Sequence, residues 1–392
     1  MKKGWEYKRL KDVGLTQTGS TPSKLVKSYY GGDVPFIRPA ELNIDNNGAI
    51  EYNSEIKLTA EGVSKSRLIK ANSILMCCIG SVGKTGYSKY DVTCNQQINS
   101  ITPYIGYFPK FVYYALLSPE FQKKAITIAN SAKATLPIIS KGKWEELQIP
   151  VPPLTEQQSI VSYLDAAFAK IDAMKANAEK ALSEAKALFQ ASLRDLLTPK
   201  KDLKWSTIGD IFETYSGGTP TKSNKEYYEG GIIPWLRSGE VCQKDITETE
   251  MFITEKGLKE SSAKYYPENT VVVAMYGATA AQVGILRIKS TSNQAVCGIL
   301  PSKDFLPEFV YYWFSSIEDK LAAQAQGGAQ PNISQQKIKK VSIPLYSLAD
   351  QQTIVSTLDS LKSKVDRLQA NYEQISGECG ALKQAILRQV FE

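Results

Sequence analysis

The amino-acid sequence contains one pattern twice, and this repeat constrains the fold more than any other feature of the chain. Segment 16–24 (TQTGSTPSK) returns as segment 214–222 (TYSGGTPTK), with the Thr-Pro pair at matching positions. Further segments return in the same order: 109–114 as 307–312, and 156–161 as 350–355. An ordered repeat of this length predicts two copies of one structural unit in tandem.

Each copy has two parts of different character. Residues 1–152 and 200–346 are rich in Gly, Pro, Tyr and Asn and contain short β-type runs such as 73–79, which predict buried strands with short helices between them. Residues 153–199 and 347–392 each predict one long helix, because apolar residues recur at spacings of three and four. We therefore expect a mixed α/β (α+β) fold. Two globular domains would be separated by two long antiparallel coiled-coil helices, with pseudo-twofold symmetry.

The two helical segments carry apolar stripes that are typical of a coiled-coil seam. At 1.5 Å per residue, a helix of about 45 residues is roughly 65 Å long. Two such helices would hold the globular domains at a fixed distance, which suits the reading of two half-sites on one DNA face. The residues predicted to pair the helices are Leu164, Ile171, Met174 and Leu188 in the first copy and Leu358, Leu361, Val365, Leu368, Ile375 and Leu382 in the second.

The composition excludes several classes of enzyme. The chain has no histidine, so imidazole bases, Ser-His and Cys-His pairs and the commonest metal ligand are absent. Its six cysteines show no Cys-x-x-Cys spacing and are interpreted as reduced, buried thiols. The net charge of +7 suits a protein that contacts phosphates in places and proteins elsewhere. We expect no metal, no cofactor and no catalytic residue in this chain.

Two short motifs resemble catalytic signatures without completing them. Segment 78–85 (CIGSVGKT) resembles a phosphate-binding P-loop, but cysteine replaces the first glycine and the second copy has no matching lysine. Segment 151–154 (VPPL) has the two prolines of the methyltransferase motif Asn/Asp-Pro-Pro-Tyr/Phe without its acid or amide. We therefore expect neither nucleotide hydrolysis nor S-adenosylmethionine chemistry.

Nothing in the sequence predicts a membrane protein. The first residues lack an apolar signal region, and no apolar run approaches the length of a bilayer span. The protein is expected to be soluble and cytoplasmic.

The repeated motifs together resemble one known family. In each copy Gly-x-Thr-Pro is followed by Tyr-Tyr, then by Pro-Phe/Trp-Ile/Leu-Arg, and then by Asn-Gln. The first copy continues with Ile-Pro-Val-Pro-Pro-Leu-Thr-Glu-Gln-Gln before the long helix, whereas the second has Ile-Pro-Leu-Tyr at the corresponding place. This order resembles the specificity subunit of type I restriction-modification systems over nearly the whole chain.

The resemblance implies a DNA-reading subunit without a catalytic centre. Each of two target recognition domains would read one half of a bipartite sequence in double-stranded DNA. The helices would set the distance between the half-sites and dock two modification (methyltransferase) subunits. Restriction (translocating nuclease) subunits would attach to these in the full complex.

The duplication also separates two kinds of candidate DNA contact. If the two halves read different sequences, residues common to both are scaffold or phosphate contacts, and base readers lie where the copies differ. The shared candidates are Thr21, Lys24, Tyr30, Arg38, Asn95 and Gln96, with their counterparts Thr219, Lys222, Tyr228, Arg237, Asn293 and Gln294. The divergent candidates are Lys65, Arg67, Lys133, Lys244, Lys264 and Asn332. For the two asparagines, a turn-stabilising amide is a competing interpretation.

Two other interpretations stay open at this point. A coiled-coil scaffold that presents two protein-binding domains would not show the steep salt dependence that phosphate contacts produce. Alternatively, the chain could serve a related system that cleaves DNA near its recognition site, which the sequence of this subunit does not distinguish from type I.

Overall fold

The computed structural model describes residues 4–42, 49–50, 52, 54–131, 135–198, 203–323 and 332–392. The chain divides into two compact units, of which unit 1 comprises Met1–Lys180 with Ala370–Glu392 and unit 2 comprises Ala181–Gln369. Each unit therefore combines a globular part with a portion of both long helices. These helices are α6 (Leu154–Leu197) and α12 (Leu348–Phe391).

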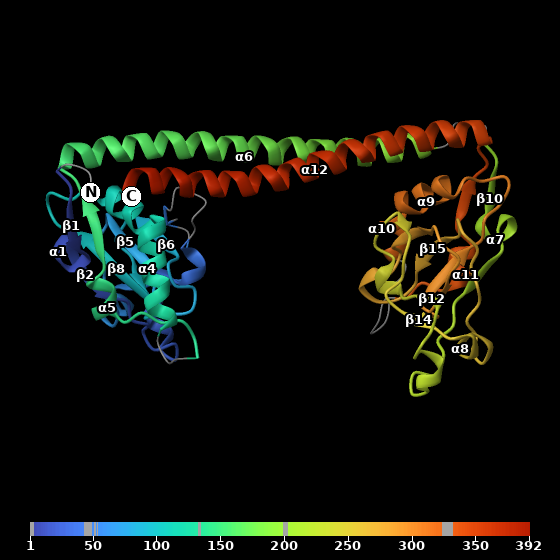
Figure 1. The fold of residues 1–392 in the computed structure, drawn as a ribbon, viewed down its shortest axis with the longest axis horizontal. Helices are drawn as coiled ribbons and strands as arrows, with labels where there is room; N and C mark the ends of the chain where they lie inside the picture. The colour runs from blue at the N-terminus through green and yellow to red at the C-terminus, as the bar shows by residue number, and fades with distance from the viewer. Residues whose placement is uncertain are drawn as a thin grey trace. The chain divides into compact units, whose positions relative to one another are not determined.

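The globular part of unit 1 is built on small sheets with short helices around them (Figure 1). Its strands are β1 (Glu6–Arg9), β2 (Gly14–Thr18), β3 (Tyr30–Ile37), β4 (Lys57–Leu58), β5 (Ser73–Cys77), β6 (Thr85–Ser88), β7 (Thr93–Cys94), β8 (Ile98–Pro103) and β9 (Gln148–Val151). Its helices are α1 (Leu10–Val13), α2 (Ala60–Ser64), α3 (Pro109–Leu117), α4 (Pro119–Asn130) and α5 (Lys141–Glu145), with 3-10 turns η1 (Lys27–Tyr29) and η2 (Pro39–Glu41). The main sheet is antiparallel in the order β2-β8-β5-β6, a second sheet has the order β4-β3-β7, and β1 pairs with β9.

Strand β5 lies between two hydrophobic cores, which explains why its apolar run is unbroken. Ile74 and Met76 belong to the core that includes α3, whereas Leu75 and Cys77 belong to the core that includes Ile37 of β3. Successive side chains of a strand point to opposite faces, so all five residues of β5 are buried.

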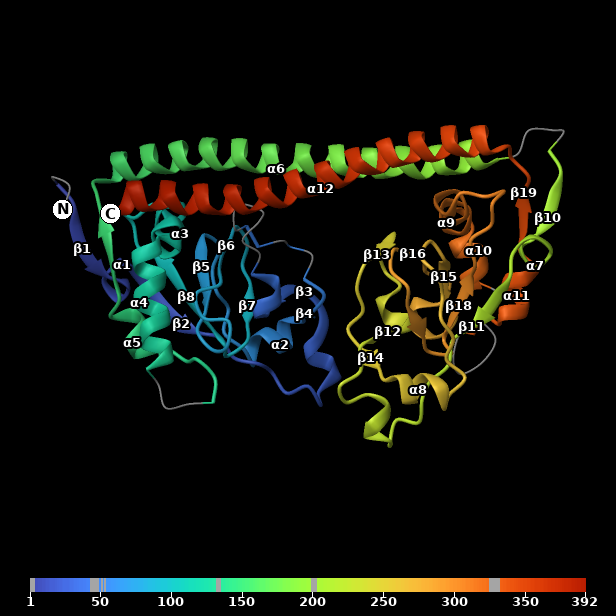
Figure 2. The same ribbon diagram turned by 45° about the vertical axis from the view of Figure 1, so that its right-hand side comes forward.

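Unit 2 repeats this plan (Figure 2). Its strands are β10 (Trp205–Thr207), β11 (Thr214–Ser216), β12 (Ile233–Leu236), β13 (Asp245–Ile246), β14 (Phe252–Ile253), β15 (Val271–Ala274), β16 (Val283–Leu286), β17 (Thr291–Ser292), β18 (Val296–Ile299) and β19 (Ser342–Pro344). Its helices are α7 (Ile208–Ile211), α8 (Glu255–Lys259), α9 (Pro307–Ser316), α10 (Glu318–Ala323) and α11 (Gln335–Lys339), with 3-10 turns η3 (Lys225–Tyr227), η4 (Ser238–Glu240) and η5 (Gly277–Thr279). The sheets have the orders β11-β18-β15-β16-β13 and β14-β12-β17, and β10 pairs with β19.

The two topologies match strand for strand apart from one addition. Strand β13 pairs in parallel with β16, where the described residues of unit 1 show a single parallel bridge between Ala49 and Tyr87. The prediction of a mixed α/β fold in two copies, combined with a long central helix and a long C-terminal helix, is confirmed.

The long helices pair antiparallel within each unit. In unit 1 the C-terminal end of α12, drawn in red, lies beside the first turns of α6, drawn in green (Figure 1). There the Lys383 ammonium donates to the carboxylate of Asp172 at 2.5 Å. In unit 2 the Lys186 ammonium donates to Gln369 Oε1 at 2.8 Å. The helix ends also complete the globular cores, since Phe168 and Phe391 belong to the core around α3.

The predicted seam is wrong at three positions. Met174 and Leu188 of α6 are 59% and 58% exposed, and Leu382 of α12 is 48% exposed. On α6 the predicted column through Leu164 and Ile171 does face inward, and both residues are buried.

The second column of the α6 seam follows at a spacing of four residues rather than three. Its buried members include Phe168 and Leu182, which are not among the residues predicted to pair the helices. On α12 the half-buried Lys383 takes the inward place next to Leu382, with its Nζ atom 5.4 Å from the centre of the Phe168 ring. The choice of Leu382 over Lys383 rested on apolarity alone. The methylene groups of a lysine can pack in a helix seam while its ammonium pairs with a carboxylate.

The other predicted pairing residues of α12 are buried to different degrees. Leu358 and Val365 are buried, whereas Leu361, Leu368 and Ile375 are half-buried. None of the described helices combines the length and apolarity that a bilayer crossing requires.

Candidate nucleic-acid interface

The loop that carries Gly-x-Thr-Pro in unit 1 is fixed at its base. The Thr21 hydroxyl donates to Gln96 Oε1 at 2.6 Å, and the Tyr30 hydroxyl donates to the carbonyl of Pro22 at 2.8 Å. A side chain at Gly19 would overlap the backbone of the Asn-Gln turn, so only glycine allows this close approach. Three predicted contact residues thus hold the loop in place.

Unit 2 builds the same loop base from the matching residues. The Thr219 hydroxyl donates to Gln294 Oε1, and the Tyr228 hydroxyl donates to the carbonyl of Pro220 at 2.6 Å. A side chain at Gly217 would overlap the backbone of Ser292. The repeated sequence motif therefore encodes one repeated local structure.

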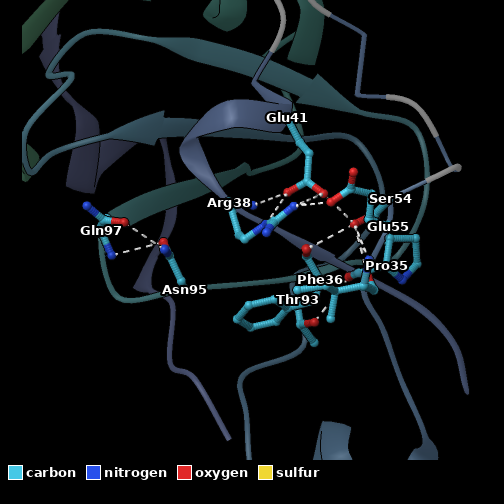
Figure 3. Close-up of polar contacts among 10 residues, drawn as sticks. Pro35, Phe36, Arg38, Glu41, Ser54, Glu55, Thr93, Asn95 and Gln97 are labelled. Carbon is cyan, nitrogen blue, oxygen red and sulfur yellow. Dashed lines mark hydrogen bonds and ion pairs between the residues drawn. The ribbon is translucent and has the colours of Figure 1, made fainter. Parts of the chain in front are cut away.

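The shared asparagines stabilise the turns that receive these loops. Asn95 Oδ1 accepts the backbone N–H of Gln97 at 3.1 Å, and Asn95 Nδ2 donates to Gln97 Oε1 at 2.9 Å (Figure 3). In unit 2, Asn293 Oδ1 accepts the backbone N–H of Ala295 at 3.1 Å. These contacts fit the interpretation of a turn-stabilising amide.

Arg38 lies within a cluster of carboxylates. Its backbone N–H donates to Glu41 at 2.7 Å, and its guanidinium reaches Glu41 at 3.3 Å and Glu55 at 2.9 Å (Figure 3). Hydrogen bonds to these two carboxylates, that of Glu41 first, raise the pKa of Arg38 above its usual value. The charge of this residue is compensated inside the unit, which favours a scaffold role over a phosphate contact. The corresponding residues of unit 2 are Arg237, Glu240 and Glu250.

The predicted lysine contacts are arranged differently. Lys24, Lys65 and Lys222 are exposed, and among the described residues none is joined to them by an ion pair. Their ammonium groups are accessible to phosphates. Lys264 is also exposed and lies over the Tyr215 ring, 5.4 Å from its centre.

Of the remaining divergent candidates, Arg67 and Asn332 lie in the described part of the chain. The Arg67 guanidinium donates to the carbonyl of Thr18 at 2.5 Å, beside the Gly-x-Thr-Pro loop. Asn332 is exposed and forms an isolated bridge with Tyr276. Lys133 lies outside the described residues.

Unit 2 has a pocket of about 480 Å³ at this loop. Its wall is formed by Tyr228, Trp235 and Met251, and cationic and amide side chains stand around this apolar surface. The lining residues are Thr219, Lys222, Lys225, Tyr228, Glu229, Trp235, Arg237, Met251, Asn293 and Gln294. All six shared candidates of the second copy thus meet at one place, although four lie within residues 219–237 and the other two at 293 and 294.

Lys244 differs from the other predicted contacts, because it is turned toward helix α12. Its side chain is 20% exposed, and its ammonium pairs with the carboxylate of Asp359 and lies 4.8 Å from the centre of the Tyr312 ring. The Tyr312 hydroxyl donates to the same carboxylate. The structure gives this lysine a role in attaching α9 to α12.

The same cluster exists in unit 1 with a lysine from another element. The Tyr114 hydroxyl donates to Asp165 at 2.5 Å, and the Lys110 ammonium pairs with Asp165 at 2.7 Å. Unit 2 has Glu308 at the position of Lys110, and Lys244 supplies the cation instead. Both units thus have a tyrosine and a lysine on one aspartate of the long helix, although the lysine comes from a different element in each. This indicates that the link between the globular part and the helix is needed in both units.

Sequence reasoning missed a second link of this kind. Gln157 is 1% exposed; its Oε1 accepts the backbone N–H of Phe108 at 2.8 Å and its Nε2 donates to the carbonyl of Pro152 at 2.9 Å. Gln351 accepts the backbone N–H of Leu306 at 2.9 Å in the same way. The signal for this link in the sequence is the repeated Glu/Asp-Gln-Gln motif in the first turns of each long helix.

The segment that resembles a P-loop does not form a phosphate cradle. The backbone N–H groups of Val82, Gly83 and Lys84 donate to nearby backbone carbonyls, so they are not directed at a ligand. Within the described ranges, no group of three or more Cys, Asp or Glu residues is placed to hold a metal ion.

Comparison with known proteins places both copies of the repeat in one group. A model of the type I restriction modification DNA specificity domain matches residues 2–183 and 200–376. The EcoR124I/EcoR124II specificity subunit of Escherichia coli is 29% identical over 261 residues, which cover 64% of this chain and 62% of that subunit. The MjaIX specificity subunit of Methanocaldococcus jannaschii is 27% identical over 313 residues, which cover 74% of this chain and 71% of that subunit.

A solved structure shares the fold over the full length. The structure concerns complex assembly and conformational transition of the type I R-M system, and one of its chains aligns with a TM-score of 0.79 and 19% identity. The alignment covers 100% of this chain and 98% of that chain. Since the family model matches both copies, the chain belongs to the specificity subunits of type I restriction-modification systems, a family of DNA-recognition subunits rather than of enzymes.

Proposed function

We propose that this chain reads a bipartite DNA target, one half with each globular part, and contributes no catalytic residue to the methylation or cleavage that follows. The proposed borders are residues 1–152 and 200–346 for the two recognition domains and 153–199 and 347–392 for the helices between them. The complex would act in the cytoplasm, where it meets DNA.

One observation carries this proposal: both units hold the same anchored loop beside an accessible lysine, Lys24 or Lys222. Lysines that have no carboxylate partner in the described part of the chain suit phosphate contacts, which fix a protein on the duplex without reading its sequence. The neighbouring divergent segments, with Lys65 and Arg67 in unit 1 and Lys264 in unit 2, supply different side chains at the same surface. A phosphate-contacting lysine common to both units, beside side chains that differ between them, suits two domains that read different half-sites.

The long helices offer a surface for partner subunits. Tyr163 and Met174 of α6 are 53% and 59% exposed, and eleven residues at 3.6 per turn place them on about the same side of the helix. Exposed apolar side chains on a common face are typical of protein contacts. We propose that two modification (methyltransferase) subunits dock on the helices and that restriction (translocating nuclease) subunits join through them.

The proposal is tested by DNA binding of the complex reconstituted with its modification subunits. Mapping of methylated adenines in a host that carries the complete system identifies the two half-sites first. Binding to the target should weaken steeply as salt rises. Lys24→Ala and Lys222→Ala should each weaken binding to target and non-target duplexes by a similar factor and reduce the salt dependence by about one counterion. Binding that does not respond to salt would overturn the proposal and favour a protein-binding scaffold.

The docking surface is tested separately. Met174→Asp should reduce the amount of modification subunit that copurifies with the chain, because a carboxylate would be buried at the contact. Glu179→Asp, on the exposed side of the same helix, serves as the control that conserves charge. Full copurification of the Met174→Asp variant would place the contact elsewhere.

A further inference from the structure

The tip of the Gly-x-Thr-Pro loop has two lysines that are the same in both copies and, between them, two residues that differ. The tip sequence is Lys24-Leu25-Val26-Lys27 in unit 1 and Lys222-Ser223-Asn224-Lys225 in unit 2. The two lysines occur in both copies, whereas the enclosed pair is apolar in one copy and polar in the other. By the logic of the duplication, the lysines are general contacts and the enclosed residues are candidates for sequence reading.

The apolar pair of unit 1 projects from a loop whose base is fixed. Leu25 is 93% exposed and Val26 is 36% exposed. The base is held by the hydrogen bonds of Thr21 and Tyr30 described above. An isolated leucine is common on protein surfaces. A nearly fully exposed leucine between two lysines at the tip of an anchored loop is a more specific arrangement.

We propose that Leu25 reads a base by contacting the 5-methyl group of a thymine in the half-site bound by unit 1. Contact with this methyl group is the means by which apolar side chains recognise a base pair in the major groove. Lys24 and Lys27 on flanking phosphates would direct the residues between them toward the groove. Ser223, at the position of Leu25 in unit 2, offers a hydroxyl that hydrogen-bonds to a base edge instead. This inference rests on the proposed function.

The helical turn that follows the tip is formed in both units. The backbone N–H of Tyr29 donates to the carbonyl of Val26 at 3.2 Å, and the backbone N–H of Tyr227 donates to the carbonyl of Asn224 at 3.2 Å. Asn224 also caps its turn, because its Oδ1 accepts the backbone N–H of Glu226 at 3.2 Å. The difference between Val26 and Asn224 therefore affects how the helical turn is capped. Among the described contacts Leu25 and Ser223 have no such role, which leaves this position as the reader.

The experiment removes the apolar group from either side of the proposed contact. Once the target has been mapped, each thymine of either half-site is replaced in turn by deoxyuridine, which lacks only the 5-methyl group. Binding of the reconstituted complex is then measured with the unaltered chain, Leu25→Ala and Lys24→Ala. Ile105→Ala serves as a matched control, because Ile105 is fully exposed in unit 1 but is not flanked by lysines.

The expected result is a loss of binding affinity at a single thymine position. At one thymine, deoxyuridine should weaken binding of the unaltered complex by about fourfold, the effect of one methyl group in an apolar contact. Leu25→Ala should bind the thymine and deoxyuridine duplexes equally, and Lys24→Ala should keep the fourfold difference at a lower affinity. Ile105→Ala should behave like the unaltered chain.

Two outcomes would overturn the inference. In one, Leu25→Ala retains the full sensitivity to deoxyuridine at every thymine. In the other, no thymine of the half-site shows any sensitivity in the unaltered complex. Either outcome can occur while binding stays salt-dependent and specific, so failure of this inference is separable from failure of the proposed function. Unchanged circular dichroism and melting temperature of Leu25→Ala would establish that the fold is intact.

Discussion

The hydroxyl of Tyr114 on α3 donates a hydrogen bond to the carboxylate of Asp165 on α6 at 2.5 Å. Tyr312 on α9 and Asp359 on α12 form the same bond in unit 2. In both units a helix of the globular part is thereby tied to a long helix by polar contacts as well as by apolar packing. Such contacts have strict geometry, so they fix how a recognition domain is held on its helix.

Removal of the Tyr114 hydroxyl should destabilise unit 1 without creating a cavity in its core. Tyr114→Phe deletes the bond to Asp165 and should lower the free energy of unfolding by about 1–2 kcal/mol. Thermal melts and urea titrations of the chain measure this change. Tyr104→Phe is the matched control, because Tyr104 is 50% exposed. If both variants unfold alike, the hydrogen bond contributes nothing to stability.

The same tyrosine predicts a dependence on alkaline pH. Burial, followed by the hydrogen bond with Asp165, raises the pKa of Tyr114 above its usual value in the folded chain. The proton is bound more tightly in the folded state, so this stabilisation is fully present below the ordinary tyrosine pKa of about 10 and is lost as the pH rises above it. The melting temperature of Tyr114→Phe should therefore fall less steeply than that of the unaltered chain between pH 10 and 11.

The buried glutamines should be more important for folding than their exposed neighbours. Gln157→Ala leaves the backbone N–H of Phe108 and the carbonyl of Pro152 without their partner, and Gln351→Ala does the same to Leu306. Each variant should lose about 1–3 kcal/mol of unfolding free energy. The adjacent Gln158 is exposed, so Gln158→Ala should change stability by less than about 0.5 kcal/mol. Equal effects of the two neighbours would contradict the assignment.

Thiol chemistry should distinguish one cysteine from the others. Cys242 is exposed, whereas the other five cysteines are buried, and burial raises the pKa of Cys78, Cys94 and Cys297 to about 12. A thiol that is buried and protonated reacts slowly. Maleimide should therefore label one site rapidly in the native chain and all six in denaturant. Rapid labelling that persists in Cys242→Ser would show that another thiol is accessible.

The sequence predicted the features that depend on repetition and on apolar runs. The two copies, the strand at Ser73–Cys77 and the long helices all follow from patterns that are local or repeated. The shared motif residues of the second copy also meet at one pocket, as a repeated functional surface would require.

The features that depend on side-chain partners could not be predicted in this way. A spacing of three and a spacing of four are equally compatible with a helix, so the seam column through Phe168 was missed and Met174 was chosen. The charge of Lys244 indicated a DNA contact, but its partner Asp359 lies 115 residues further along the chain. Only the folded structure shows that a charged side chain already has a partner.

Cys379, Leu387 and Phe391 belong to the same core as Trp5 and Leu10, and the Phe391 ring lies 5.4 Å from that of Phe111. During synthesis, residues near position 5 leave the ribosome long before residues near position 390. Part of the apolar surface of the first recognition domain therefore stays uncovered until residues 379–391 have been translated. Chaperones that bind exposed apolar segments would have an opportunity to act on this domain for longer than on the second.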